Sequence, residues 1–193
     1  MDCTWDLSFL YKSFDDEAFQ SDLKKWPEMI KAQQELLAAD LDDRTKLEKL
    51  FENDENMTAL SRRVYSFVSM TLATEANNGT AQLYADKLSL IGNQGRLVDS
   101  AITRYVGSIA NLEEIIAASE KLQPIAFAIR EMAEEASHTI PAEIEPWLLQ
   151  MSLSGGSAFS QLRGKLESNQ MVEYRGKAWP LAAVRGMAYD ADP

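Results

Sequence analysis

The chain has 193 residues, enough for one domain or two small ones with a buried core. Its 19 Lys and Arg against 30 Asp and Glu give a net charge of −11, and the imbalance is concentrated in residues 1–60. This negative field repels a phosphate backbone, so nucleic acid is not an expected partner. One cysteine, Cys3, excludes an internal disulfide, and one histidine, His138, excludes every site that needs two.

The N-terminus and the hydropathy pattern indicate a soluble, cytoplasmic protein. The opening Met1–Asp6 has no basic region followed by an apolar one, so it is not a signal peptide. No apolar run approaches the ~20 residues that a membrane span requires. A single cysteine is typical of a reducing compartment.

Apolar residues recur at helical spacing from the start of the chain. A first helix is expected from about Ser13, whose hydroxyl can cap it, with a kink or a break at Pro27. A second helix is expected to begin at Asp42 or Asp43. The polar stretch 53–56 is expected to interrupt it.

The next two helices are bounded by small and polar residues. A third helix is expected from about Thr58 to a stop at Gly79, where glycine can take the left-handed cap position. A fourth opens at Thr80, and Gly92 and Gly95 are expected to weaken it before the apolar pattern resumes.

The second half of the chain reads as shorter helices. Asn111 is expected to cap a short helix by a capping-box spacing, and Pro124 and Pro141 are each expected at a first helical position. The Gly155–Gly156 pair separates two further helices.

The one β signal comes late, where residues 171–174 and 178–181 flank a polar turn and predict a hairpin. The sequence therefore predicts an all-α fold in one domain. We expect a multi-helix array of roughly seven to nine helices, with at most a small β-hairpin near residues 171–181.

The sequence lacks the residues of a zinc-peptidase motif. A zinc-binding peptidase helix needs two histidines four residues apart with a glutamate beside the first, and His138 is alone. We expect His138 to be a helix-terminal imidazole. The stretch 154–157 lacks the Gly-x-Ser-x-Gly order of a nucleophile turn, so we expect a loop between helices there.

Other motifs are also better explained by structure than by chemistry. Residues 40–43 begin like a calcium loop, but Thr45 and Phe51 stand where such a loop needs glycine and glutamate, so we expect a helix cap. Residues 92–95 are too short for a phosphate-binding loop and are expected to interrupt a helix. Cys3 has no neighbour that would lower its pKa.

Aromatic side chains are dense near the N-terminus, and we interpret them as packing anchors rather than a ligand cage. They are Trp5, Tyr11, Phe14, Phe19 and Trp26. The residues themselves show no catalytic constellation. We assign no catalytic, cofactor-binding or metal residue. Composition and residue pattern by themselves predict a helical, acidic scaffold or binding module.

Two stretches carry a resemblance to a known family. The first is Trp5-Asp6-Leu7-Ser8-Phe9-Leu10-Tyr11 with Ser13-Phe14-Asp15-Asp16; the second is Ile144-Glu145-Pro146-Trp147-Leu148-Leu149, then Ser154-Gly155, Ala158-Phe159, Leu162-Arg163 and Lys165-Leu166. Their order and separation resemble oligoendopeptidase F proteins, among the thimet-oligopeptidase-like zinc peptidases. Phe159 stands where tryptophan is more usual in this family. The predicted hairpin and Val184-Arg185 fit the family's sequence after the second stretch.

The resemblance implies that residues 1–193 are the N-terminal helical lobe of a larger, two-lobed cytoplasmic metallopeptidase. It covers about the first third of a family member, and it implies that the His-Glu-x-x-His helix lies beyond Pro193. Asp192-Pro193 is typical of the start of a helix, yet no helix follows it in this sequence, and this agrees with truncation before the catalytic domain. The lobe would admit short peptides to a channel, with zinc as the cofactor of the full-length protein and none in this part.

Two alternatives remain open. The chain can be a free-standing helical interaction module that binds a partner helix or a basic surface through its acidic front. A non-metal enzyme has the least support, since no base–nucleophile pair is visible. If the chain is a severed lobe, its partner is the missing C-terminal catalytic domain, and exposed apolar surface is expected to cause self-association.

Overall fold

The computed structural model describes residues 6–189, which form eight α-helices and one two-stranded antiparallel sheet. The all-α prediction with a small hairpin is confirmed. The sequence analysis expected one domain, but the chain divides into two compact units, residues 1–143 and 144–193. We call them unit 1 and unit 2. No helix in the described part is both long and apolar enough to cross a membrane.

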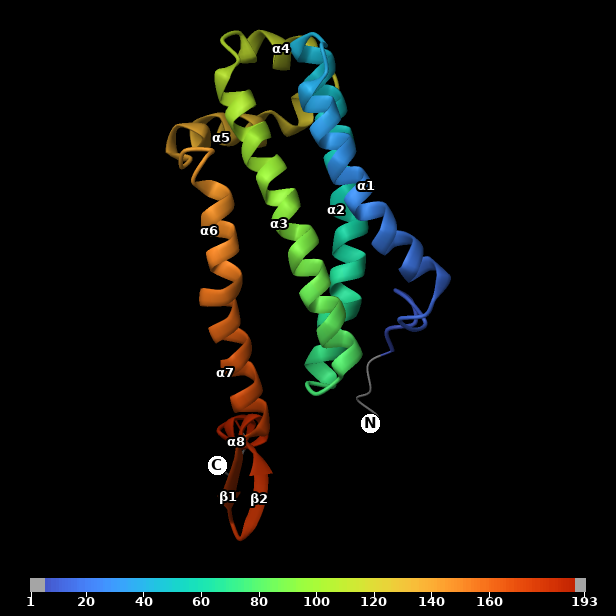
Figure 1. The fold of residues 1–193 in the computed structure, drawn as a ribbon, viewed down its shortest axis with the longest axis vertical. Coiled ribbons are helices and arrows are strands. Elements are labelled where there is room, and N and C mark those ends of the chain that lie inside the picture. Colours follow the sequence, from blue (N-terminus) through green and yellow to red (C-terminus); the bar gives the residue numbers. More distant parts are fainter. Residues whose placement is uncertain (1–5, 190–193) are drawn as a thin grey trace. The chain divides into compact units, whose positions relative to one another are not determined.

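Unit 1 is built on three long helices that pack against one another (Figure 1). They are α1 (Glu17–Ala38), α2 (Asp43–Thr74) and α3 (Gly79–Ser108). Each begins at a side chain that accepts a hydrogen bond from a backbone N–H of the first turn: Asp16 from Ala18, Asp42 from Thr45 and Asn78 from Ala81.

Two of these caps differ from the predicted ones. The first helix is capped by Asp16 and not by Ser13, whose hydroxyl instead accepts from the N–H of Asp15 in the preceding turn. Gly79 does not end a helix in the left-handed conformation. It is the first residue of α3, because the Asn78 side chain caps that helix. The prediction of a cap at Asp42 is confirmed.

The predicted interruptions are wrong at two places, where tertiary contacts outweigh local propensity. The polar stretch 53–56 lies inside α2, where the Asn53 amide donates to the Met29 carbonyl of α1. Gly92 and Gly95 lie inside an unbroken α3, and Gly95 is buried against Ile30 of α1. Pro27 lies inside α1 without breaking it, and the kink expected as the alternative stays a prediction.

Shorter helices complete unit 1. They are α4 (Leu112–Ala118), a 3₁₀ turn η1 (Gln123–Ile125), α5 (Ala126–Glu135) and a 3₁₀ turn η2 (Ala136–His138). Asn111 precedes α4 as predicted, but its side chain makes no cap hydrogen bond. Pro124 is the second residue of the 3₁₀ turn η1, in its first turn, whereas Pro141 lies outside any helix, so the prediction for Pro141 is wrong.

An aromatic cluster holds the segment before α1 onto the three long helices. Tyr11 and Phe19 are buried with ring centroids 5.2 Å apart, and Phe14 lies 5.0 Å from Phe67 of α2 and 5.1 Å from Tyr84 of α3. The interpretation of the N-terminal aromatics as packing anchors is confirmed for the described ones. Trp5 and Cys3 lie outside the described residues.

Unit 2 consists of helices and one hairpin. Its elements are α6 (Glu145–Ser152), a wide π-helical turn η3 (Leu153–Ser157), α7 (Ala158–Asn169), β1 (Met171–Tyr174), β2 (Lys177–Pro180) and α8 (Leu181–Met187). The strands pair with Met171 opposite Pro180 and Tyr174 opposite Lys177. The turn residues Arg175 and Gly176 both have positive φ, as a two-residue hairpin turn requires.

Candidate functional site

The candidate motifs of the sequence lie in helical structure. His138 ends η2, its side chain is exposed, and its Nε2 lies 3.9 Å from the Glu134 carboxylate. The prediction of a helix-terminal imidazole is confirmed. The stretch 154–157 is not a loop but the wide turn η3, with the helical geometry broken only at Gly155. The Gly-Gly pair therefore separates α6 and α7 as predicted, through a distorted turn.

No set of three His, Cys, Asp or Glu side chains that could hold a metal ion is present in residues 6–189. A catalytic zinc takes three protein ligands and a water. The described residues of this chain do not fit a zinc ion, so no step of zinc chemistry is assigned to them.

A polar pocket in unit 1 lies between α4 and α5. It has a volume of about 470 Å³ and is lined by residues 110–114 and by Arg130, Ala133 and Glu134. Arg130 donates two hydrogen bonds of 2.7 Å to the Glu113 carboxylate, which holds the pKa of Glu113 below its usual value. This pair fixes the end of α4 to α5.

A second pocket, of about 220 Å³, lies among α1, α2, α3 and α5. Apolar side chains of Leu50, Phe51, Ile102 and Met132 line it together with Gln33 and two carboxyl groups, Asp54 and Asp99. The two acidic groups come from neighbouring helices, and the charge of Asp54 acts on the carboxyl group of Asp99.

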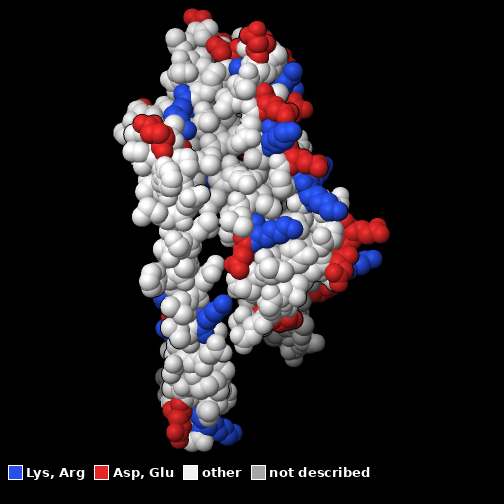
Figure 2. Space-filling view, in the orientation of Figure 1, with Lys and Arg blue, Asp and Glu red and all other residues white. Residues whose placement is uncertain are grey.

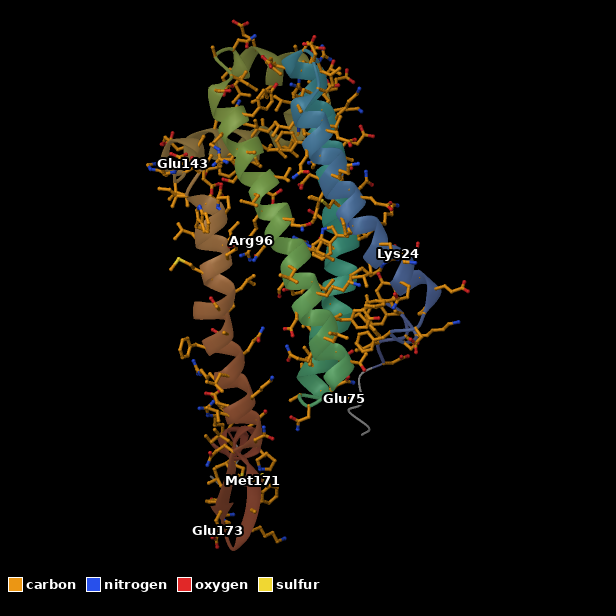
Figure 3. The ribbon with its side chains drawn as sticks, viewed as in Figure 1. Lys24, Glu75, Arg96, Glu143, Met171 and Glu173 are labelled. Atoms are coloured by element: carbon orange, nitrogen blue, oxygen red, sulfur yellow. The ribbon has the colours of Figure 1, made fainter. Side chains whose placement is uncertain are left out.

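The pKa of Asp99 is raised to about 6, first by burial of the carboxyl group and then by the charge of Asp54. Arg96 of α3, labelled in Figure 3, acts in the opposite direction. Burial also raises the pKa of Asp54. The residue Asp99 as a whole still reaches solvent, so water moderates this effect.

A buried amide network forms one wall of this pocket. Gln33 is 1% exposed; its amide donates to the Leu50 carbonyl at 3.0 Å and its side-chain oxygen accepts from Asn53 at 2.8 Å. Each buried polar atom is thus paired, as a low-dielectric interior demands. The network fixes α1 to α2 beside the two carboxyl groups.

Unit 2 carries large apolar side chains that are exposed on its helices. None of residues 144–189 is buried. Five large apolar side chains on α6 and α7 keep at least half of their surface exposed: Trp147 (68%), Met151 (66%), Phe159 (71%), Leu162 (50%) and Leu166 (64%). We call these five the α6–α7 apolar surface. In Figure 2 the visible face of these helices is mostly uncharged.

The Asp54–Asp99 pair was not predicted from the sequence. Asp54 was read as part of a helix interruption, yet it follows Leu50 and Phe51 by four and three residues, a spacing that places it on the same helical face. Asp99 likewise precedes the buried residues Ile102 and Thr103 by three and four residues, so it lies on the same face of α3 as they do. A carboxyl group on an otherwise apolar helix face was the available signal.

Comparison with known proteins gives a family match over part of the chain. Residues 108–168, 61 of the 193, match the family model described as Oligopeptidase F, which represents the N-terminal part of that peptidase family (Peptidase_M3_N). The segment runs from the last residue of α3 to near the end of α7, and it includes the α4–α5 pocket and the α6–α7 apolar surface. No curated protein and no solved structure matches the chain.

The match confirms the resemblance found in the sequence. Residues 108–168 are similar to the N-terminal region of oligopeptidase F, and this segment is about a third of the chain's length.

Proposed function

We propose that this chain forms the N-terminal, substrate-gating lobe of an oligoendopeptidase F-like zinc peptidase that hydrolyses short peptides. The observation that carries the proposal is the match of residues 108–168 to the oligopeptidase F family. In this proposal the zinc and the catalytic groups belong to a separate catalytic domain, and the whole peptidase acts in the cytoplasm.

The architecture of unit 1 supports a steric role. A gate that excludes folded proteins must keep its shape, and α1, α2 and α3 are joined by a continuous core with buried hydrogen bonds such as that between Gln33 and Asn53. The lobe then acts through its shape, and the chemistry belongs to its partner domain.

The first test reads the coding sequence beyond Pro193 for a His-Glu-x-x-His motif followed by a later glutamate. The proposal expects this motif. A stop codon at that point contradicts the peptidase lobe and favours a helical interaction module.

The second test is enzymatic. The 193-residue chain is assayed for zinc content and for cleavage of quenched short peptides with and without a chelator, beside the full-length protein. We expect stoichiometric zinc and chelator-sensitive turnover only in the full-length protein, and no cleavage of a folded protein substrate. Chelator-sensitive cleavage by the 193-residue chain alone would refute the proposal.

A matched control separates loss of folding from loss of chemistry. The full-length protein with glutamine in place of the motif glutamate should bind zinc and lose turnover, because the general base is removed and the ligands remain. If that variant keeps full activity, the assigned peptidase class is wrong.

A further inference from the structure

We propose that the cavity among α1, α2, α3 and α5 binds a primary ammonium group carried on a short aliphatic stem. The inference goes beyond the proposed function and does not rest on it, because the cavity lies wholly within unit 1. Its walls combine the two kinds of surface that such a ligand needs, namely apolar side chains and the carboxyl groups of Asp54 and Asp99. An apolar lining with a few converging polar groups is the usual make-up of a small-ligand site.

The two carboxyl groups lack a partner within the protein. Among residues 6–189, neither Asp54 nor Asp99 accepts a hydrogen bond or forms an ion pair with a basic side chain. Even well-exposed carboxylates of unit 1 have such a partner: Glu113 pairs with Arg130, and Glu52 with Lys121. Charges that are withdrawn from water are normally paired. A cation that enters the cavity supplies the donors that the protein does not.

The buried amide of Gln33 fixes one wall and leaves the carboxyl groups to a ligand. Gln33 is 1% exposed; its amide donates to the Leu50 carbonyl at 3.0 Å, and its oxygen accepts from Asn53 at 2.8 Å. Because both polar atoms already have partners inside the protein, Gln33 does not compete for the carboxylates. The polar head of a ligand is therefore held by Asp54 and Asp99, which an anion would not tolerate.

Size and charge select the class of ligand. The volume of about 220 Å³ equals roughly seven waters at ~30 Å³ each, which suits an ammonium group with a few carbons. The stem can lie against Leu50, Ile102 and Met132, while the ammonium group donates to the carboxylates. Unit 1 holds 14 basic and 25 acidic residues, and this field attracts cations. A divalent metal fits less well, because the apolar walls cannot complete the six or more oxygen ligands that Ca²⁺ takes.

Binding should depend on pH through Asp99. Burial first, and then the charge of Asp54, raise its pKa to about 6, so the carboxyl group is mostly protonated at pH 5 and ionised at pH 8. The charged groups that face it are Asp54 of α2 and Arg96 of α3, whereas α1 and α5 contribute the uncharged Gln33 and Met132. An alkylammonium keeps its proton over this range. Its affinity at pH 8 should therefore exceed that at pH 5 by up to about tenfold.

The test titrates n-butylammonium into the 193-residue chain at pH 8 and follows the backbone amide signals by NMR, which detects the weak affinity expected of so small a ligand. We expect saturable shifts centred on the amides around Asp54 and Asp99. Two matched ligands separate the contributions: n-butanol keeps the stem without the charge, and methylammonium keeps the charge without the stem. Each should bind at least about tenfold more weakly than n-butylammonium.

Asp99→Asn is the test variant, because it keeps the size of the side chain and removes its charge. It should weaken the binding of n-butylammonium about tenfold and abolish the pH dependence. Asp86→Asn is the matched control: Asp86 also lies on α3, is exposed, and does not line the cavity. This variant removes the same charge and should change the affinity by less than about twofold.

A further titration with N-acetyl-lysine amide identifies the source of the ammonium group. Tighter binding of this compound than of n-butylammonium indicates a lysine side chain, and weaker binding indicates a free amine; both support the site. The inference is overturned if n-butylammonium causes no saturable shifts around the cavity or if n-butanol binds equally well. It is also overturned if Asp86→Asn weakens binding as much as Asp99→Asn. None of these outcomes bears on peptide hydrolysis by the full-length protein, so the two proposals fail independently.

Discussion

The close approach of α3 to η2 at Gly107 gives the sharpest test of unit 1. A Cβ atom added at Gly107 would lie 2.3 Å from the Cβ of Ala136 and 3.3 Å from the Ala133 carbonyl oxygen. The Ala136 Cβ is bonded directly to the backbone, so it cannot rotate away and the 3₁₀ turn must shift. Overpacking of this kind costs about 1–3 kcal/mol.

Gly95→Ala is the matched comparison within the same helix. A Cβ at Gly95 would lie 3.6 Å from the nearest atom of Ile30, which is ordinary contact. Alanine is favoured over glycine by about 1 kcal/mol in a helix interior, so Gly95→Ala should stabilise unit 1 by roughly 0.5–1 kcal/mol. The two substitutions are chemically identical and are expected to have opposite signs.

Urea unfolding followed by circular dichroism measures both free energies, and thermal melts should show a shift of about 2–4 °C for each kcal/mol. The double variant Gly107→Ala with Ala136→Gly should recover part of the loss, because it removes the atom that clashes. If Gly107→Ala proves as stable as Gly95→Ala, the packing of α3 on η2 described above is wrong.

Two further predictions concern polar groups of unit 1. Asp99→Asn should raise the free energy of unfolding above pH 7 by about 1 kcal/mol, a value discounted for solvent exposure. The reason is that the folded-state pKa of Asp99, about 6, lies above the ordinary 3.8, so the ionised carboxylate destabilises the fold of the unmodified chain. This destabilisation is absent below pH 3.8 and grows as the pH rises to about 6. Equal urea midpoints for Asp99→Asn and the unmodified chain at pH 8 would contradict it. Asn53→Ala should destabilise unit 1 by about 1–3 kcal/mol, since it leaves the buried Gln33 oxygen without its donor. Its control Asn56→Ala, which loses only an exposed bond to its own helix, should change stability by less than about 0.5 kcal/mol, and similar losses in both would refute the role of the network.

Local sequence patterns were sufficient to predict the class of the fold. Apolar residues at helical spacing predicted the helices, Asp42 predicted a cap, and Arg175-Gly176 between two short β-prone stretches predicted the hairpin. Each of these signals depends on residues within a few positions of one another. The order of short sequence motifs also indicated the resemblance to oligoendopeptidase F, and this resemblance is confirmed over residues 108–168.

Tertiary contacts decided where the helices continue and which polar groups meet. Gly95 and the stretch 53–56 look like interruptions in the sequence, but Ile30 packs on the first and the Gln33 network pairs the second, so α3 and α2 run through them. The Asp54–Asp99 pair likewise joins residues 45 positions apart, a meeting that no local spacing indicates. Local propensities differ by about 1 kcal/mol or less for most residues, whereas burial and hydrogen bonding across helices contribute more, and these depend on the assembled fold.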